Sequence, residues 1–255
     1  MGMALHWLGK NLARYLSQKK HIHGIPDATS PELLLDALRV GDVLLVEGNS
    51  RASTAIKFLS QSTWSHSALY VGNRITEVTG KTTSHCFIEA DMNEGVRSTG
   101  IEEYAGFHTR ICRPTGLNEV ECRQVADYAV ARIGQQYDLR NIFDLVRYLM
   151  PTPLVPSRFR RRLLTLGSGD PTRAICSTLI AQAFQSIRYP ILPAIEQRNA
   201  NRVDCPECIE EIYKRRHYSL FTPRDFDVSP YFAIIKPKLE IGFDFKTFKW
   251  EGRSQ

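Results

Sequence analysis

Residues 64–72 read WSHSALYVG, a short and mainly apolar run that ends at Gly72. Positions 65–71 predict a buried β-strand, and Gly72 with Asn73 supplies the turn that follows it. His66 stands at the start of this strand, where the backbone gives its ring a fixed direction, as a general base requires. A lone histidine in a strand is usually structural, so a catalytic role for His66 depends on its partners.

The chain on either side predicts further strands and helices around this one. Strands are expected at 42–47, 83–90, 109–113 and 231–235, and helices at 30–38, 118–133 and from 170 onward, with a helical turn at 53–59. Asn118 and Glu121 have the spacing of a capping box. The pattern predicts an α+β protein with a small, mostly antiparallel sheet and helices packed against it.

Two further residues complete a possible catalytic set with His66. Cys176 lies near the start of the helix whose apolar positions repeat every four residues, where free N–H groups and the helix dipole favour a thiolate and an oxyanion hole. Glu89 shares one face of its strand with Phe87, and its carboxylate is expected beside His66, where it would fix the tautomer. Taken singly, Cys176 would more often be a small core residue. The three together favour a nucleophile, a base and an orienting acid.

The composition is ordinary for a soluble globular protein. The 255 residues are 43% hydrophobic and 24% charged, and no stretch approaches the roughly 18 apolar residues of a membrane span. The N-terminus does not have the pattern of a signal peptide; Leu5, Leu8, Leu12 and Leu16 instead predict an amphipathic helix, packed on the domain or touching a membrane surface. We therefore expect a cytoplasmic protein.

The net charge of +6 is concentrated in the second half of the chain. Residues 151–255 hold 17 Lys/Arg against 11 Asp/Glu, with Arg158, Arg160, Arg161 and Arg162 as the densest cluster. This cluster is either a solvated face or a peripheral membrane contact. No nucleic-acid motif or interleaved aromatic platform accompanies it, so no nucleic-acid partner is expected.

The six cysteines are interpreted as free thiols, because no secretory signal accompanies them. Cys205 and Cys208 have the spacing of a metal or redox pair, with His217 as a candidate third ligand. Ordinary thiols remain the favoured interpretation, since the chain has no second pair of this kind.

Six short motifs, in this order, resemble a known family. They are GDVLLV at 41–46, WSHSALYVG at 64–72, FIEAD at 87–91 with Gly95-Val96 and Glu103-Tyr104, GQQYD at 134–138, CSTLI at 176–180 and TPRD at 222–225. Together they resemble the circularly permuted papain-like branch of the NlpC/P60 superfamily, which includes lecithin-retinol acyltransferase-like proteins. They are most similar to the bacterial YiiX/YebB-like (YaeF-like) cysteine amidases.

The resemblance implies a papain-like core, an antiparallel sheet or small barrel packed against helices, in which the histidine precedes the cysteine. Cys176, His66 and Glu89 fall on the family's nucleophile, base and third polar residue. Tyr137, Ser177 and Tyr70 stand in the same motifs and are expected to bind substrate or support the site. Residues 41–240 would form the catalytic domain, with an insertion at about 139–168, after a helical segment at 1–40 and before a tail at 241–255.

The predicted function is a cysteine-dependent hydrolase or acyltransferase that acts on an amide or ester bond through an acyl-enzyme and needs no metal or organic cofactor. The substrate stays open between a peptide amide, such as a γ-D-glutamyl link, and a lipid ester or N-acyl amide, and the basic and apolar segment 142–164 slightly favours the lipid substrate. The alternatives are a non-catalytic binding module on the same scaffold and a zinc-dependent interaction protein built on Cys205, Cys208 and His217. The sequence gives no oligomeric state.

Overall fold

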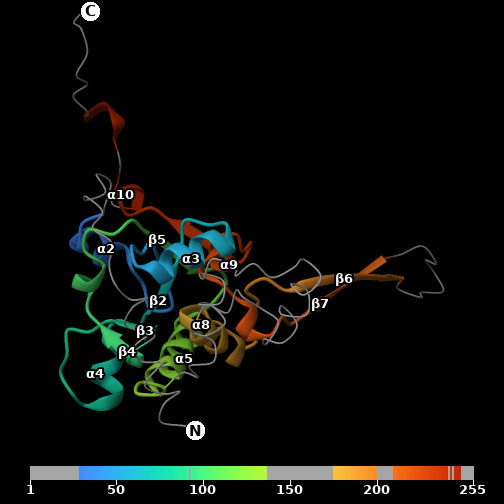
Figure 1. Cartoon of the computed structure of the whole chain (residues 1–255), viewed down its shortest axis with the longest axis horizontal. Coiled ribbons are helices and arrows are strands. Elements are labelled where there is room, and N and C mark those ends of the chain that lie inside the picture. Colours follow the sequence, from blue (N-terminus) through green and yellow to red (C-terminus); the bar gives the residue numbers. More distant parts are fainter. Residues whose placement is uncertain are drawn as a thin grey trace, which may run out of the picture.

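A six-stranded antiparallel sheet organises the chain in the computed structural model, which describes residues 29–91, 93–136, 175–199, 209–240, 242 and 244–247. Its strand order is β4-β3-β2-β1-β5-β8, so the described strands form an open sheet with β4 and β8 at its edges (Figure 1). The strands are β1 (Val43–Val46), β2 (His66–Tyr70), β3 (Phe87–Asp91), β4 (Gly95–Thr99), β5 (Thr109–Pro114) and β8 (Phe232–Ile235).

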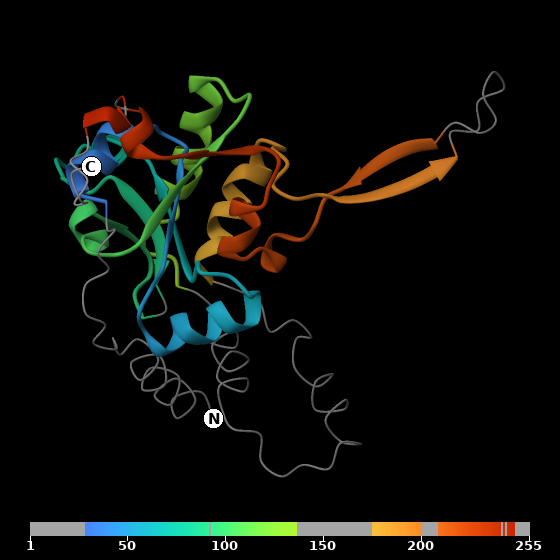
Figure 2. The ribbon, with the colours of Figure 1, turned by 90° about the horizontal axis from the view of Figure 1, so that it is seen from above.

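Helices cover both faces of the sheet, which explains why β1 is apolar at every position. On one face, Leu45, Leu69 and Ile88 pack in a core with α5 (Glu119–Val130) and α8 (Ile175–Ser186). On the other, Leu44, Ala68 and Phe87 pack with α2 (Pro31–Ala37) and the short helix η1 (Ile101–Tyr104) (Figure 2). Neighbouring residues along each strand thus enter different cores, as the alternation of side chains requires.

The remaining elements are short. They are α3 (Arg51–Ser60), α4 (Arg74–Thr79), β6 (Ala194–Asn199), β7 (Ile209–Lys214), η2 (Tyr218–Leu220), α9 (Pro223–Asp227), α10 (Pro237–Glu240) and η3 (Phe245–Thr247). Strands β6 and β7 form a separate two-stranded ribbon that projects from the body (Figures 1 and 2). Among the described residues, no helix combines the length and apolar character needed to cross a membrane.

Most of the expected elements are present, with local corrections. The capping box at Asn118 and Glu121 is confirmed in both directions, at 3.0 and 2.9 Å, but α5 ends at Val130 rather than near 133, and a turn leads from there to Gly134. The strand expected from 83 begins only at Phe87. Strand β4, helix α4 and the β6–β7 ribbon were not predicted, because none of them has a clear apolar periodicity.

Several expectations concern residues outside the described part of the chain. These are the helix expected around Leu5–Leu16, the insertion at about 139–168 with its arginine cluster, the pair Cys205 and Cys208, and most of the tail at 241–255.

A buried ion pair fixes the start of β1. Asp42 is 1% exposed and accepts hydrogen bonds from Nε and Nη2 of Arg113 on β5, at 3.0 and 2.8 Å, and from the backbone N–H of Arg39 at 2.9 Å. Burial raises the pKa of the Asp42 carboxyl, while the bonds from Arg113 and Arg39 oppose that shift. The polar residue in the GDVLLV motif therefore joins the end of α2 to two central strands.

We expect Arg113→Met to destabilise the fold by about 3–5 kcal/mol, because it leaves the Asp42 carboxylate buried without its counter-charge. Urea unfolding monitored by circular dichroism measures this loss. Arg123→Met is the matched control, since Arg123 meets Glu119 on the exposed surface of α5 and such pairs contribute about 1 kcal/mol or less. Equal losses in the two variants would contradict the role given to the Asp42–Arg113 pair.

Candidate active site

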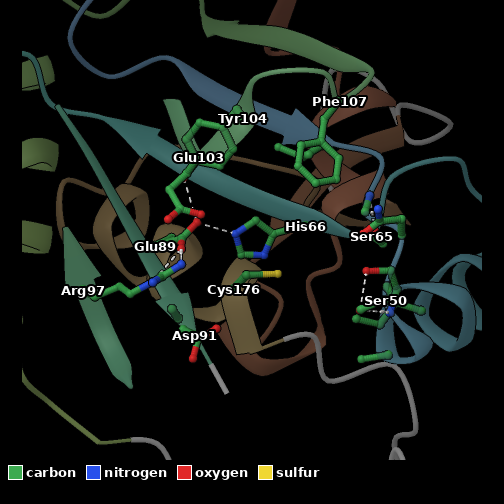
Figure 3. Close-up of a pocket in the computed structure, with 17 residues that line it drawn as sticks. Ser50, Ser65, His66, Glu89, Asp91, Arg97, Glu103, Tyr104, Phe107 and Cys176 are labelled. Carbon is green, nitrogen blue, oxygen red and sulfur yellow. Dashed lines mark hydrogen bonds and ion pairs between the residues drawn. The ribbon is translucent and has the colours of Figure 1, made fainter. Parts of the chain in front are cut away.

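Cys176 is the second residue of α8, and its side chain lines a pocket at the end of the sheet (Figure 3). Its side chain is buried, and α8 packs against β2 and β3 at this point. Within the described residues, α8 begins at Ile175, so the backbone N–H of Cys176 lies in the first described turn, and the first four N–H groups of a helix have no carbonyl partner within it. A negative charge on the sulfur, or on an oxygen beside it, therefore lies at the positive end of α8.

His66 begins β2, paired with Val46 of β1, and its ring points into the same pocket (Figure 3). Its Nε2 lies 2.7 Å from Oε2 of Glu89 on the neighbouring strand β3. Glu89 projects on the same side as Phe87, as the alternation predicted, and is 3% exposed. The remaining ring nitrogen, Nδ1, is left for Cys176, whose side chain lies beside the His66 ring, and each of the two groups shifts the pKa of the other (Figure 3).

The Glu89 carboxylate is held by two further side chains. Arg97, directly opposite Glu89 in the β3–β4 register, reaches Oε1 through Nε at 2.8 Å and Nη2 at 2.7 Å. The Tyr104 hydroxyl on η1 donates to Oε2 at 2.7 Å. Burial alone would raise the pKa of Glu89, but the His66 charge, the bonds from His66 and Tyr104 and the Arg97 charge outweigh it and lower that pKa to about 2. The carboxylate is thus ionised at neutral pH.

The electrostatics favour a thiolate–imidazolium pair. Burial opposes the charged form of His66, but the negative Glu89 and the bond to Cys176 raise its pKa well above the usual value. Burial likewise opposes the Cys176 thiolate, yet the hydrogen bond and charge of His66 lower the pKa of that thiol. Both shifts are in the direction that favours transfer of the thiol proton to the imidazole.

Two buried serines lie beside the sulfur. Ser177 Oγ is 3.9 Å from the sulfur of Cys176 and 3.4 Å from Oγ of Ser67 on β2, and both serines are completely buried. Side-chain and backbone hydrogen bonds from Ser67 also help to lower the pKa of Cys176. Ser67 therefore supports the thiolate from the α8 side of the sheet.

The pocket in front of the sulfur has a volume of about 210 Å³. His66, Glu89 and Arg97 form one side, and the opposite side carries Ser50 and Ser65 (Figure 3). The lining also holds the apolar side chains of Val46, Ala52, Ile56, Ala90 and Phe107, together with the polar or acidic Asn49, Ser53, Asp91 and Glu103. A small group with both polar and apolar parts therefore fits next to the reactive sulfur.

The structure brings together Cys176, His66 and Glu89, the residues that the sequence placed on three separate elements. Ser177 lies behind the sulfur, whereas Tyr70 stands at the opposite end of β2 from His66 and does not line the pocket. Tyr137 is outside the described residues; the loop before it pairs with β4 through the backbone of Gly134 and Gln135.

Sequence reasoning gave no site role to Arg97 or Ser67, and it quoted Tyr104 only as part of a motif. The signals were available in part: Ser67 follows the candidate base, and Arg97 lies one short hairpin after Glu89. The hairpin was missed because β4 itself was not recognised.

The described residues contain no group of ligands that would support the alternative of a zinc site at Cys205, Cys208 and His217. His217 Nδ1 faces Oγ of Ser219 at 2.8 Å, while Cys205 and Cys208 lie outside the described residues. Within the part of the chain that is described, no three His, Cys, Asp or Glu side chains are grouped so as to hold a metal ion.

Comparisons with known proteins give a family match and a similarity to a solved structure. Residues 37–148 match the family model of the permuted papain-like amidase enzymes, YaeF/YiiX, C92 family. Among solved structures, the chain is similar to the metalloprotein yiiX from Escherichia coli O157:H7 (DUF1105), with 14% sequence identity and a TM-score of 0.47 over 78% of this chain and 97% of that one. No curated protein matches the chain.

We expect the free energy of unfolding to depend on Glu89 at acid pH. Its pKa of about 2 in the fold is below the value of about 4.3 in an unfolded chain, so its ionisation stabilises the fold above about pH 4.3. That contribution, about 3 kcal/mol, is lost as the pH falls toward 2. Urea unfolding gives the free energy of unfolding of the wild type and of Glu89→Gln at each pH. Plotted against pH, the two free energies should converge as the pH falls toward 2. A constant difference between them would show that Glu89 is not ionised in the fold.

Proposed function

Residues 37–148 match the family model of the YiiX-like permuted papain-like amidases, and from that premise we propose that this chain is a cysteine amidase in which Cys176 is the nucleophile and His66 the base. The family match indicates hydrolase activity at the level of the papain-like amidases. The observation that carries the residue assignment is the meeting of Cys176, His66 and Glu89 in one pocket, with the His66 ring bonded to the Glu89 carboxylate at 2.7 Å.

The proposed reaction uses this contact in two steps. The Cys176 thiolate attacks the amide carbonyl, and the oxygen that becomes negative is stabilised by the backbone N–H of Cys176 at the start of α8. The imidazolium of His66 then gives its proton to the leaving nitrogen as the C–N bond breaks, which leaves a thioester on Cys176. Water attacks the thioester, its proton passes to His66, and the carboxylic acid product leaves with the thiolate restored.

Glu89 stays ionised through both steps in this proposal. Its bond to Nε2 holds the ring so that Nδ1 faces the sulfur, and its charge stabilises the imidazolium. A non-catalytic binding module would have no use for a buried ionised carboxylate bonded to a histidine beside a buried cysteine, because buried charged pairs contribute little net stability once their desolvation is counted. The electrostatics of the site therefore favour an enzyme over a binding module.

The size of the pocket favours a small acyl group. A cavity of roughly 150 Å³ is enough for a benzene ring, so about 210 Å³ suits a group the size of one amino-acid residue. The serines and apolar side chains of the wall also suit a peptide-like group. We propose a peptide-like amide as the substrate rather than a long-chain lipid ester or N-acyl amide.

We expect Cys176→Ala and Cys176→Ser to lose turnover by at least about a thousandfold, because the nucleophile is removed while the fold stays intact. Labelling by a thiol-directed acyl probe, located by mass spectrometry, gives a second measurement. Cys86→Ser is the control: Cys86 is partly buried outside the pocket, burial raises its pKa to about 11, and activity should persist. Full activity in Cys176→Ala would refute the assignment.

The substrate class can be tested with a series of amides that differ only in the acyl group. We expect kcat/KM for aminoacyl amides to exceed that for a fourteen-carbon acyl amide by about tenfold or more, because the long chain cannot be enclosed beside Cys176. Assays with and without anionic vesicles separate the two classes further. Preference for the long chain, or activity that depends on vesicles, would favour the lipid alternative.

A further inference from the structure

The Glu89 carboxylate has no unused hydrogen-bonding direction toward the pocket. Oε1 is taken by two nitrogens of Arg97, and Oε2 is shared by Nε2 of His66 and the hydroxyl of Tyr104, all at 2.7–2.8 Å. These donors come from β4, β2 and η1, so each approaches from a different direction. Arg97 alone would leave the carboxylate able to turn about its Cγ–Cδ bond; Tyr104 removes that freedom at the oxygen facing His66.

The position of Tyr104 is itself fixed on two sides. Its ring is 4% exposed and packs edge-on against Phe87 with centroids 5.0 Å apart. Its oxygen lies 3.0 Å from Oγ1 of Thr99, the last residue of β4, which is 3% exposed. Since the Tyr104 proton goes to Glu89, Thr99 is the donor in this contact. The hydroxyls thus point in one direction, from Thr99 through Tyr104 to Glu89, and bonds in such a chain strengthen one another.

We propose that Tyr104 is a positioning residue of the active site, whose hydroxyl holds the Glu89 carboxylate in the one orientation that keeps His66 turned toward Cys176. This inference rests on the proposed function, because it gives Tyr104 a role only through the Cys176–His66 pair. Tyr104 takes no proton and touches no reacting atom; it acts through Glu89. The competing explanation is that Tyr104 is simply a core aromatic residue packed on Phe87.

Substitution Tyr104→Phe separates the two explanations, because it removes the hydroxyl and keeps the ring against Phe87. Without that bond the carboxylate turns more freely, the imidazolium is less well placed, and the Cys176 thiolate loses stabilisation. We therefore expect alkylation of Cys176 by iodoacetamide to slow by about tenfold at pH 6, the size expected for one hydrogen bond to a charged group. The acid limb of its pH profile should move to higher pH.

Alkylation is followed by mass spectrometry on the tryptic peptide 174–188, in which Cys176 is the only cysteine. Tyr128→Phe is the matched control, since it removes a tyrosine hydroxyl on α5 outside the pocket. We expect the pH profile of this control to equal that of the wild type. An unchanged profile in Tyr104→Phe, with the fold intact by circular dichroism, would overturn the proposal.

A double substitution tests whether Tyr104 acts through Glu89. In a Glu89→Gln background, Tyr104→Phe should cause no further change in the profile, because the charge that it positions is already gone. The same additional loss in both backgrounds would mean that Tyr104 acts through the core, and the proposal would fail. The alkylation assay needs no substrate, so it also tests the proposed function separately. If Cys176 of the wild type reacted over the pH range of an ordinary thiol, that result would contradict the proposed function itself.

Discussion

The buried carboxylate of Glu89 is the constraint on which this site depends. An ionised group that is 3% exposed costs several kcal/mol of desolvation unless its partners are in place. Here those partners come from β2, β4 and η1, so the carboxylate is stable only when three elements beside β3 have assembled. The sheet and the candidate site therefore form together. The Glu89 carboxylate, which orients His66, thus bonds to the edge strand β4 and to the inner strand β2.

The sequence was sufficient to predict which faces the main residues occupy. Alternation along 87–91 put Glu89 on the Phe87 side, and the four-residue repeat after 175 put Cys176 at a helix start. The alternation along a strand predicts which face of the sheet a side chain occupies. It does not predict which residue of the next strand lies opposite, because that depends on the register between the two strands. Arg97 is opposite Glu89 because a hairpin pairs Asp91 with Gly95, after a turn in which Asp91 accepts from the N–H groups of Asn93 and Glu94. Strand β4 is short and only partly apolar, so its pairing could not be predicted.

The order of the proposed catalytic residues along the chain has little physical weight in this fold. His66 and Cys176 are 110 positions apart, and their approach is decided by α8 lying across β2 and β3 with its first turn at the end of the sheet. That packing depends on the apolar face of α8, where Leu179, Ile180, Ala183 and Phe184 are fully or almost fully buried. The apolar repeat that predicts a helix is visible in the sequence. Which strands that helix packs against is decided only in the assembled core. The resemblance to a family supplied what periodicity could not.

The charges of the site alternate in space, and this arrangement bears on the chemistry. In the proposed charge state, the Cys176 thiolate faces the His66 imidazolium, which faces the Glu89 carboxylate, which faces the Arg97 guanidinium. The set is neutral overall, so its burial costs less than that of any member alone. In the proposed reaction, the negative charge of the thiolate moves to an oxygen near the start of α8 while the other three charges stay where they were. The surroundings need little reorganisation during that step, which is the condition under which preorganised dipoles lower a barrier most effectively.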